Sequence, residues 1–534
     1  MRRLLLVLTV LLTLLIGCQQ EPAGPSEQAQ PAIKTGGVYR VPLPWSPANL
    51  DPPFTTDIYS VTLIQQIFDG LVQFDQSLNI APNLATSWIV SRDKLTYTFT
   101  LRKDAKFHNG RLVRADDFVY SFTRILDPEV QAGAASFFKK IKGASSYRNG
   151  KNKRVEGLRA LGPHTLEITL SEPFAPFMSV LAMKDSKVVP REEVERLGKE
   201  FGRHPVGTGP FRLESWEGNR IVLSANHNYH EGRPYLDRIE FTVYEGSQNE
   251  RIFQDFQGGL LEEALVFGGI REQIAKSPQY QFVRKPTLSL LFYGMNCRTE
   301  PLNNHLVRQA VNYAINKARI VREVYRDQFV VADTLLPPGM PGYFPENAFF
   351  THDAQKARKL LEQAGYGAAR PSPALTLLSA SRSQAAQKEF ELLTNDLAEV
   401  GISLQVKYET DWSTFEEQVR QGKFVMYRYA YFADVPDPDN FLGTLCGSAS
   451  PYNFMGYGNQ RVDALLSEAL TRVDLMNRAA IYREAEALIL EDAPMVPLLY
   501  LTFESAFQPY VKGLQISALG APYIPLKKIW LDEH

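Results

Sequence analysis

The chain has 534 residues, of which 58 are lysine or arginine and 59 are aspartate or glutamate, so its formal net charge is −1. Nucleic-acid binders normally carry a surplus or a patch of basic residues, and this balance argues against that class of protein. The length exceeds what one hydrophobic core usually supports, so we expect two or three lobes.

The chain opens with the features of an export signal. Two arginines precede an apolar run at 4–16, which is too short to span a bilayer comfortably. The run ends in Leu-Ile-Gly-Cys, which resembles the bacterial lipoprotein signal, where cleavage before the cysteine is coupled to attachment of lipid to its sulfur. A plain secretory signal with an incidental cysteine is the alternative. We therefore expect residues 1–17 to be a signal peptide and Cys18 to be lipidated.

Residues 18–35 have the composition of a flexible tether. They are rich in Gln, Pro, Ala, Ser and Glu, and such a segment cannot bury enough apolar surface to offset its ordering entropy. We expect this tether to hold a folded body outside the cytoplasm, at the surface of a bacterial membrane. In a Gram-negative cell that body would be periplasmic.

Strand and helix candidates then alternate without a repeat period, which predicts an α/β or α+β multidomain protein. The strand candidates, rich in β-branched and aromatic residues, are 96–101, 165–170, 220–224, 239–244, 288–295 and 404–408. The helix candidates are 61–68, 115–125, 307–325, 354–364, 385–400 and 461–490. Asp353 is a predicted N-cap and Gly365 a predicted C-cap of the helix between them.

Patterns that carry catalytic chemistry are missing from the sequence. The segment 207–210, Gly-Thr-Gly-Pro, lacks the lysine of a phosphate loop and predicts a tight structural turn. His227 and His230 have no third ligand nearby in sequence, so we expect no metal site. The acidic pairs 116–117 and 262–263 are expected on solvated faces. These patterns favour a binding protein without a cofactor over an enzyme.

Two cysteines follow Cys18, and an exported protein can form disulfides. Cys297 and Cys446 could form one bridge. Their wide separation in sequence leaves open whether they meet.

Nine segments occur in an order that resembles the extracellular solute-binding proteins of peptide ABC transporters, the oligopeptide- and dipeptide-binding proteins. They are NLDPPF (49–54), FDGLVQFD (68–75), APNLATSW (81–88), YTFTLRKDAKFHNG (97–110), ADDFVYSFTRILDP (115–128), VEGLRALGPHTLEITLSEP (155–173), PVGTGPFRLESW (205–216), NHNYHEGRPYLDRIEF (226–241) and RQAVNYAINKARIV (308–321). No single segment is diagnostic, whereas their succession is.

The resemblance implies an α/β, two-lobed periplasmic-binding-protein fold that closes about a hinge around its ligand. We expect lobe I at 36–71, 190–288 and 497–534, an extra subdomain of lobe I at 72–189, and lobe II at 289–496. The implied partners are short peptides and the permease and ATPase of an ABC transporter. We expect the protein to be a monomer.

A receptor for many peptides must bind what they share, an ammonium, a carboxylate and a backbone. A carboxylate facing the ammonium makes a strong charge-assisted hydrogen bond. Asp434, in ADVPDPDNFL (433–442), matches the family motif whose first aspartate holds the peptide N-terminus. Without the resemblance, Asp434 would be a turn residue beside two prolines.

The resemblance suggests two arginines for the peptide carboxylate. Arg428 matches a position where oligopeptide binders carry an arginine facing the site, and Arg382 falls near a carboxylate-binding arginine of dipeptide binders. A guanidinium suits a carboxylate, but either residue could instead be a surface arginine.

Four aromatic residues are candidates for the walls of side-chain pockets. Trp412 and Tyr431 occupy places where family members line these pockets, and Tyr120 and Phe292 are weaker candidates. Each could equally be a core residue.

Two other classes of function stay open. The same fold could bind another cargo, such as a nickel chelate, haem or an oligosaccharide, or could act as a peptide sensor. The second alternative is a surface hydrolase, although the eight histidines show no convincing catalytic arrangement.

Overall fold

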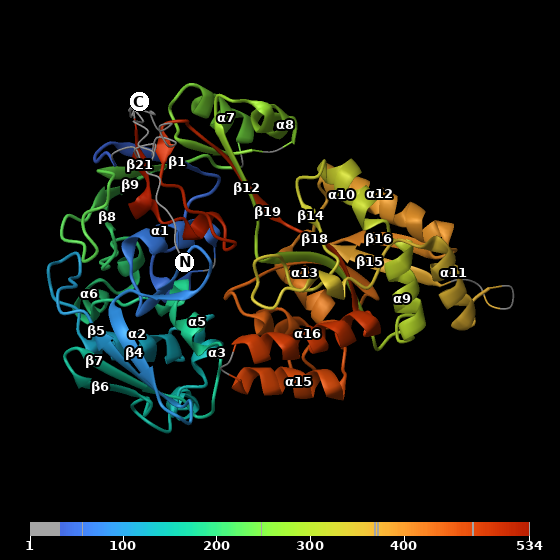
Figure 1. Cartoon of the computed structure of the whole chain (residues 1–534), viewed down its shortest axis with the longest axis horizontal. Helices are drawn as coiled ribbons and strands as arrows, with labels where there is room; N and C mark the ends of the chain where they lie inside the picture. The colour runs from blue at the N-terminus through green and yellow to red at the C-terminus, as the bar shows by residue number, and fades with distance from the viewer. Residues whose placement is uncertain are drawn as a thin grey trace, which may run out of the picture.

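The structure is a computed structural model and describes residues 33–532 except 56, 247, 267, 368–369, 371–372 and 473–474. The elements form two halves, joined by strands β12 (Gln281–Pro286) and β19 (Thr502–Phe507), which run between them (Figure 1). β12 and β19 pair antiparallel although they are far apart in sequence. The connection between the halves is therefore a narrow two-stranded ribbon.

The first half contains two four-stranded sheets, each with its own hydrophobic core. The first sheet has the order β1 (Val38–Leu43), β10 (Arg238–Val243), β9 (Arg220–Ala225), β8 (Phe211–Glu217) and packs on α1 (Ile58–Ile67). The second has the order β4 (Ala85–Val90), β5 (Thr96–Leu101), β7 (Thr165–Thr169), β6 (Leu158–Gly162) and packs on α2 (Ala115–Leu126). This second layer lies at the lower left of Figure 1.

Shorter elements complete the first half. The helices are α3 (Ala135–Phe138), α4 (Ala144–Arg148), α5 (Phe177–Leu181), α6 (Arg191–Leu197), α7 (Asn249–Gln257) and α8 (Gly268–Lys276). The strands are β2 (Val72–Phe74), β3 (Ile80–Pro82), β11 (Glu263–Leu265), β20 (Val511–Lys512) and β21 (Trp530–Leu531).

The second half is built on one mixed sheet covered on both faces. Its order is β14 (Val330–Val331), β18 (Met495–Tyr500), β13 (Ser289–Met295), β17 (Met426–Phe432), β15 (Ala374–Ser379), β16 (Ser403–Tyr408). One face packs on α9 (His305–Ala314), α10 (Lys317–Tyr325), α11 (Ala354–Gln363) and α12 (Gln384–Glu399). The other packs on α13 (Trp412–Arg420), α14 (Leu442–Cys446), α15 (Gln460–Thr471) and α16 (Leu475–Asp492). The expected lobe boundaries stay a prediction.

Two long helices predicted from the sequence are each two helices. The segment 307–325 breaks after Ala314, because Asn316 leaves the helical conformation and its side chain accepts the N–H of Arg319, capping α10. The segment 461–490 likewise divides into α15 and α16. The caps of α11 are as predicted, since Asp353 accepts the N–H of Lys356 and Gly365 has a positive φ of 87°.

The tight turn predicted at 207–210 is not confirmed, because this segment has only a bend at 209–210 and runs beside the end of α1, where the N–H of Gly209 donates to the carbonyl oxygen of Ile67 at 2.8 Å. Gly207 lies against the end of α1, where a Cβ would come within 2.0 Å of the carbonyl oxygen of Ile67. Only glycine permits this approach.

The expectation of solvated acidic pairs is wrong for Glu262 and Glu263, because β1 brings partners to both. Glu262 is fully buried and accepts from Arg40 Nε at 3.0 Å. Glu263 accepts from the Tyr39 hydroxyl at 2.7 Å, and burial raises the pKa of Glu263 to about 7. In the other pair, Asp117 is buried and accepts from Arg111 at 2.7 Å.

Cys297 and Cys446 are free thiols in this structure, so the disulfide that the sequence left open is not formed. Cys18 lies outside the described residues. Among the helices of the described residues, none combines the length and apolar character needed to cross a bilayer.

Candidate functional site

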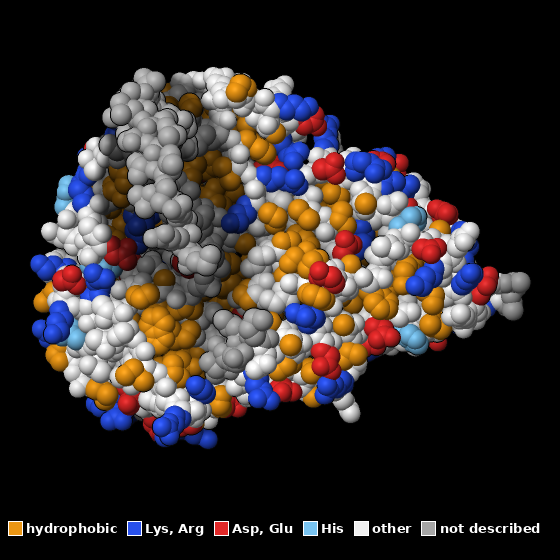
Figure 2. Space-filling view, viewed as in Figure 1, with side chains coloured by type: hydrophobic (Ala, Val, Ile, Leu, Met, Phe, Trp, Pro, Cys, Tyr) orange, Lys and Arg blue, Asp and Glu red, His pale blue; other side chains and the backbone are white. Residues whose placement is uncertain are grey.

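A cavity of about 960 Å³ lies between the two halves, and we call it the Asp434 cavity. The first half contributes residues at 53–55, 131–140 and 183–185, and the second contributes residues from 431 to 470. The face shown in Figure 2 is hollowed between the halves, with hydrophobic side chains on both sides of the hollow. The dimensions suit a ligand of small-molecule or short-peptide size.

The halves touch along one edge of this cavity. The N–H of Ala175 donates to the carbonyl oxygen of Leu470 at 2.8 Å. Val435, which follows the end of β17, is buried in the core of the β4–β7 sheet of the first half. The wall that carries Asp434 is therefore held against the first half.

Asp434 presents an unpaired carboxylate to the cavity. Its backbone N–H donates to Asn440 Oδ1 at 2.7 Å, which fixes the turn after β17. Its side chain is exposed on the cavity wall and has no ion-pair partner within the part of the chain that the structure describes. Burial by the surrounding walls raises the pKa of Asp434 and Asp185 adds to this rise, whereas Lys184 and a side-chain interaction with Asn440 oppose it. The turn thus holds a carboxylate in place without neutralising it.

Three residues further on, Asp437 has the opposite character. It is buried and forms a bidentate ion pair with Arg478, with distances of 2.5 and 2.7 Å. The same loop therefore carries Asp437, which is neutralised by Arg478, and Asp434, whose carboxylate is available to a ligand.

The other charged groups of the cavity wall are largely engaged. Lys184 pairs with Asp185 at 2.8 Å, and Lys140 pairs with Glu172. Burial, together with the neighbouring carboxylate of Asp437, raises the pKa of Asp439 to about 7. The wall is consequently short of cations for a ligand carboxylate.

Aromatic rings run from the cavity toward α13. Tyr431 lines the cavity and packs edge-on against Phe441, with ring centroids 5.3 Å apart. Tyr452 lines the cavity too, and from it a row continues through Phe454, Tyr429 and Trp412 at centroid distances of 6.2, 6.0 and 5.5 Å. Trp412, at the exposed end of this row, is not part of the cavity wall.

Arg428 lies on β17 but turns away from the cavity. Successive side chains of a strand point to opposite faces, and Arg428 faces α12, where its Nε and Nη2 donate to both oxygens of Glu389 at 2.8 and 3.0 Å. Glu389 is fully buried and also accepts from Tyr293. The geometry gives no support to a carboxylate-binding role for Arg428, and that role stays a prediction.

Three further candidates also lie outside the cavity wall. Arg382 is exposed, with its guanidinium 4.9 Å from the ring of Tyr408. Tyr120 is half-buried on α2, and Phe292 is buried in the core of the second half. The structure brings together Asp434 and Tyr431 only.

Several residues of the Asp434 cavity wall were not predicted from the sequence. Asp439 belongs to the same segment as Asp434 and could have been found there. Lys184 and Tyr452 come from different halves, so only the folded chain shows that they share a cavity. Among the described residues, no group of three or more His, Cys, Asp or Glu side chains could hold a metal ion.

Comparisons with known proteins agree with this architecture. A sequence model of the bacterial extracellular solute-binding proteins, family 5 Middle, matches residues 79–453. Heme-binding protein A of Haemophilus influenzae is 29% identical, with 96% of this chain and 97% of that protein covered. The dipeptide-binding protein DppE of Bacillus subtilis is 28% identical, with 97% and 96% covered.

Among solved structures, the unliganded open form of the periplasmic murein tripeptide-binding protein MppA matches with a TM-score of 0.81 and 25% identity. The match covers 94% of this chain and 99% of MppA. The predicted two-lobed α/β fold is confirmed.

Proposed function

Because this chain belongs to family 5 of the bacterial extracellular solute-binding proteins, which serve ABC importers, we propose that it captures short peptides in the Asp434 cavity for delivery to a permease. The ammonium of the peptide would bind the Asp434 carboxylate. Tyr431 and Tyr452 would line the space for peptide side chains.

The observation that carries this proposal is the unpaired Asp434 carboxylate in a cavity between the two halves. Burial disfavours the ionised form of the Asp434 carboxylate. A ligand ammonium beside this carboxylate would stabilise its charge through a charge-assisted hydrogen bond. The relative DppE is a dipeptide-binding protein by name, which is consistent with such a cargo.

Calorimetric titration of a short peptide into the purified protein tests the proposal. We expect Asp434→Ala to weaken binding at least tenfold, or about 1.4 kcal/mol, because the peptide ammonium loses its carboxylate. Asp463→Asn is the matched control, since Asp463 lines the same cavity and bonds the N–H of Ser448 at 2.9 Å.

Equal affinity of wild type and Asp434→Ala would remove Asp434 from the site. Hemin belongs in the same titration series, because a relative is named for haem. Tight hemin binding without peptide binding would contradict the proposed cargo. Recovery of intact peptide after incubation would speak against a hydrolase.

We also propose that lipid on Cys18 anchors the protein to the membrane, on the basis of the Leu-Ile-Gly-Cys sequence. Several acyl chains at one residue hold a protein on a bilayer more firmly than one chain does. Mass spectrometry of the mature N-terminal peptide tests this, and an unmodified thiol at Cys18 would contradict it.

A further inference from the structure

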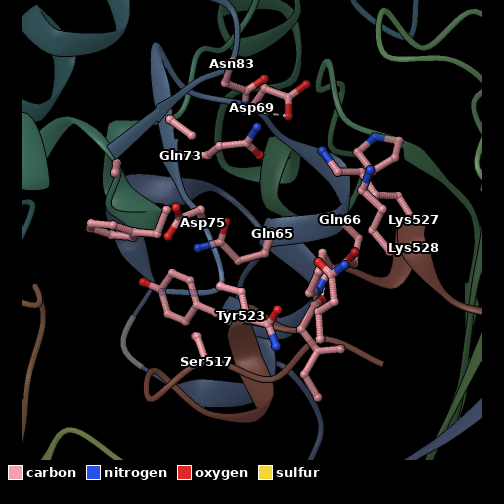
Figure 3. Close-up of a pocket in the computed structure, with 18 of the residues that line it drawn as sticks. Gln65, Gln66, Asp69, Gln73, Asp75, Asn83, Ser517, Tyr523, Lys527 and Lys528 are labelled. Atoms are coloured by element: carbon pink, nitrogen blue, oxygen red, sulfur yellow. Dashed lines mark hydrogen bonds between the residues drawn. The ribbon is translucent and has the colours of Figure 1, made fainter. Parts of the chain in front are cut away.

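A second cavity, of about 520 Å³, lies in the first half of the molecule and shares no lining residue with the Asp434 cavity. Its walls come from the end of α1, the β2–β3 hairpin and the chain after β20. In Figure 3, Gln65 and Gln73 lie near its centre, Lys527 and Lys528 on one side and Asp75 on the opposite side. The volume falls in the range of small-molecule sites. We call it the Lys187 cavity.

Lys187 lines this cavity as a buried cation without a partner. The residue is 5% exposed, and within the described residues its Nζ has neither a hydrogen-bond acceptor nor a carboxylate at ion-pair distance. Lys527, on the same wall, differs because it pairs with Glu231 at 2.7 Å.

Asp69, the carboxylate that acts most strongly on Lys187, does not bond to it, because other side chains engage Asp69. The Asp69 carboxylate accepts from Asn83 at 3.1 Å and from Tyr229 at 3.3 Å, and it lies 3.2 Å from His230 Nε2. Asp69 therefore contributes to Lys187 through its field and not through a direct bond.

Burying an unpaired ammonium is costly, because the group gives up its hydration. Burial lowers the pKa of Lys187 to about 8. Asp69 and Asp185 oppose this shift, whereas Lys527 adds to it. An anion in the cavity would replace the lost hydration with a charge-assisted hydrogen bond.

A second donor lies beside the same space. Gln65 Nε2 is buried and meets no acceptor with good hydrogen-bond geometry in the described structure, although its interaction with the Tyr523 hydroxyl opposes the rise that burial causes in the pKa of Tyr523. A ligand with two or more acceptor oxygens has enough acceptors for both the ammonium and the amide. Carboxylate and phosphate groups have this property, whereas a cation or an apolar molecule would leave both donors unsatisfied.

We propose that the Lys187 cavity binds a small molecule through a carboxylate or phosphate group, whose oxygens accept from Lys187 and Gln65. The cavity is larger than a lone anion, so the rest of the molecule lies against polar groups that include Gln73, Ser517 and Tyr523. This site shares no lining residue with the Asp434 cavity and does not depend on the proposed cargo, although Asp185 acts electrostatically on both Asp434 and Lys187.

Calorimetric titrations of sodium acetate and of sodium phosphate, at pH 7 and at an ionic strength held constant with chloride, test the site and distinguish the two anions. We expect the wild-type protein to bind at least one of them and Lys187→Met to bind it at least tenfold more weakly. Lys199→Met, a change on the exposed surface of the first half, is the matched control. Absence of binding to both anions, or equal affinity in Lys187→Met, would overturn the proposal.

A pH series on the wild-type protein gives a test that does not depend on how Lys187→Met folds. Acetate stays an anion above pH 7, and the charged groups that act on Lys187 are Asp69, Asp185 and Lys527. With the pKa of Lys187 at about 8, acetate affinity should fall about tenfold between pH 7 and pH 9, because the ammonium loses its proton. An affinity that stays constant over this range would contradict the role of Lys187.

Discussion

Asp434 in one cavity and Lys187 in the other are charged side chains without an ion-pair partner among the described residues, but their charges are opposite and their settings differ. Asp434 lies between the halves, next to the contacts by which the second half packs against the first, and the two-stranded ribbon connects these halves. Lys187 lies within the first half, in a cavity whose walls include the end of α1 and the β2–β3 hairpin. The first cavity suits a ligand that is captured by closure, and the second suits a ligand held by a preformed pocket.

This contrast distinguishes charged side chains that stabilise the fold from charged side chains that are available to a ligand. Asp437, Glu389 and Glu262 are buried carboxylates, and each has an arginine partner inside the protein. Asp434 and Lys187 have no such partner among the described residues. Breaking a paired charge should therefore cost stability, whereas removing an unpaired charge should cost binding.

The largest expected effect comes from Arg428→Met, which breaks the pair with Glu389. Because Glu389 would remain as an uncompensated buried charge, we expect the free energy of unfolding to fall by about 3–5 kcal/mol. Urea denaturation measures this loss. Where the variant is still folded, its peptide affinity should stay within about twofold of wild type.

A tenfold loss of peptide affinity in Arg428→Met, without loss of stability, would restore Arg428 as the carboxylate anchor. The exposed Arg382, paired with no carboxylate in the described structure, serves as the control through Arg382→Met.

A change of opposite sign is expected for Lys187→Met, at a position that is more deeply buried than Arg428. The folded protein releases the Lys187 proton near pH 8, whereas the unfolded chain keeps it up to about pH 10.5, so unfolding takes up a proton between these values. The wild type should gain stability as pH rises through this window. At pH 7, without anion, Lys187→Met should be more stable by roughly 3 kcal/mol.

This gain should shrink as pH approaches 10. Urea denaturation of both proteins at pH 7 and pH 9.5 measures it. A loss of stability in Lys187→Met at pH 7 would show that Lys187 has a favourable contact within the fold, and the two cavities would then no longer be comparable.

The smallest expected effect on stability is that of Asp434→Asn. Because the side chain lies on a cavity wall without an ion pair, the free energy of unfolding should change by less than about 1 kcal/mol. A loss as large as that of Arg428→Met would mean that the Asp434 carboxylate supports the fold.

Local signals in the sequence predict much of the fold. The alternation in Thr96–Leu101 gives β5 with its bounds, and Asp353 and Gly365 give the caps of α11. The break at Asn316 could also have been predicted, because asparagine is a strong N-cap, but the apolar periodicity on both sides masks it.

The site is harder to predict, because the ion-pair partner of a charged residue depends on the tertiary structure. The family motif places Asp434 in the cavity, yet nothing near Arg428 in sequence shows that Glu389 neutralises it. For the same reason Glu262 was expected in solvent, although Arg40 on β1 binds it across more than 200 positions. The Lys187 cavity joins segments from residues 65 to 528, and no local pattern marks it.

The central claim is that Asp434 binds the ammonium of a peptide. The most direct test compares a short peptide with its N-acetylated form, titrated into the wild-type protein and into Asp434→Asn. Acetylation removes the ammonium, so the wild type should bind the free peptide at least tenfold more tightly, and Asp434→Asn should lose most of that preference. A preference of equal size in both proteins would contradict the account.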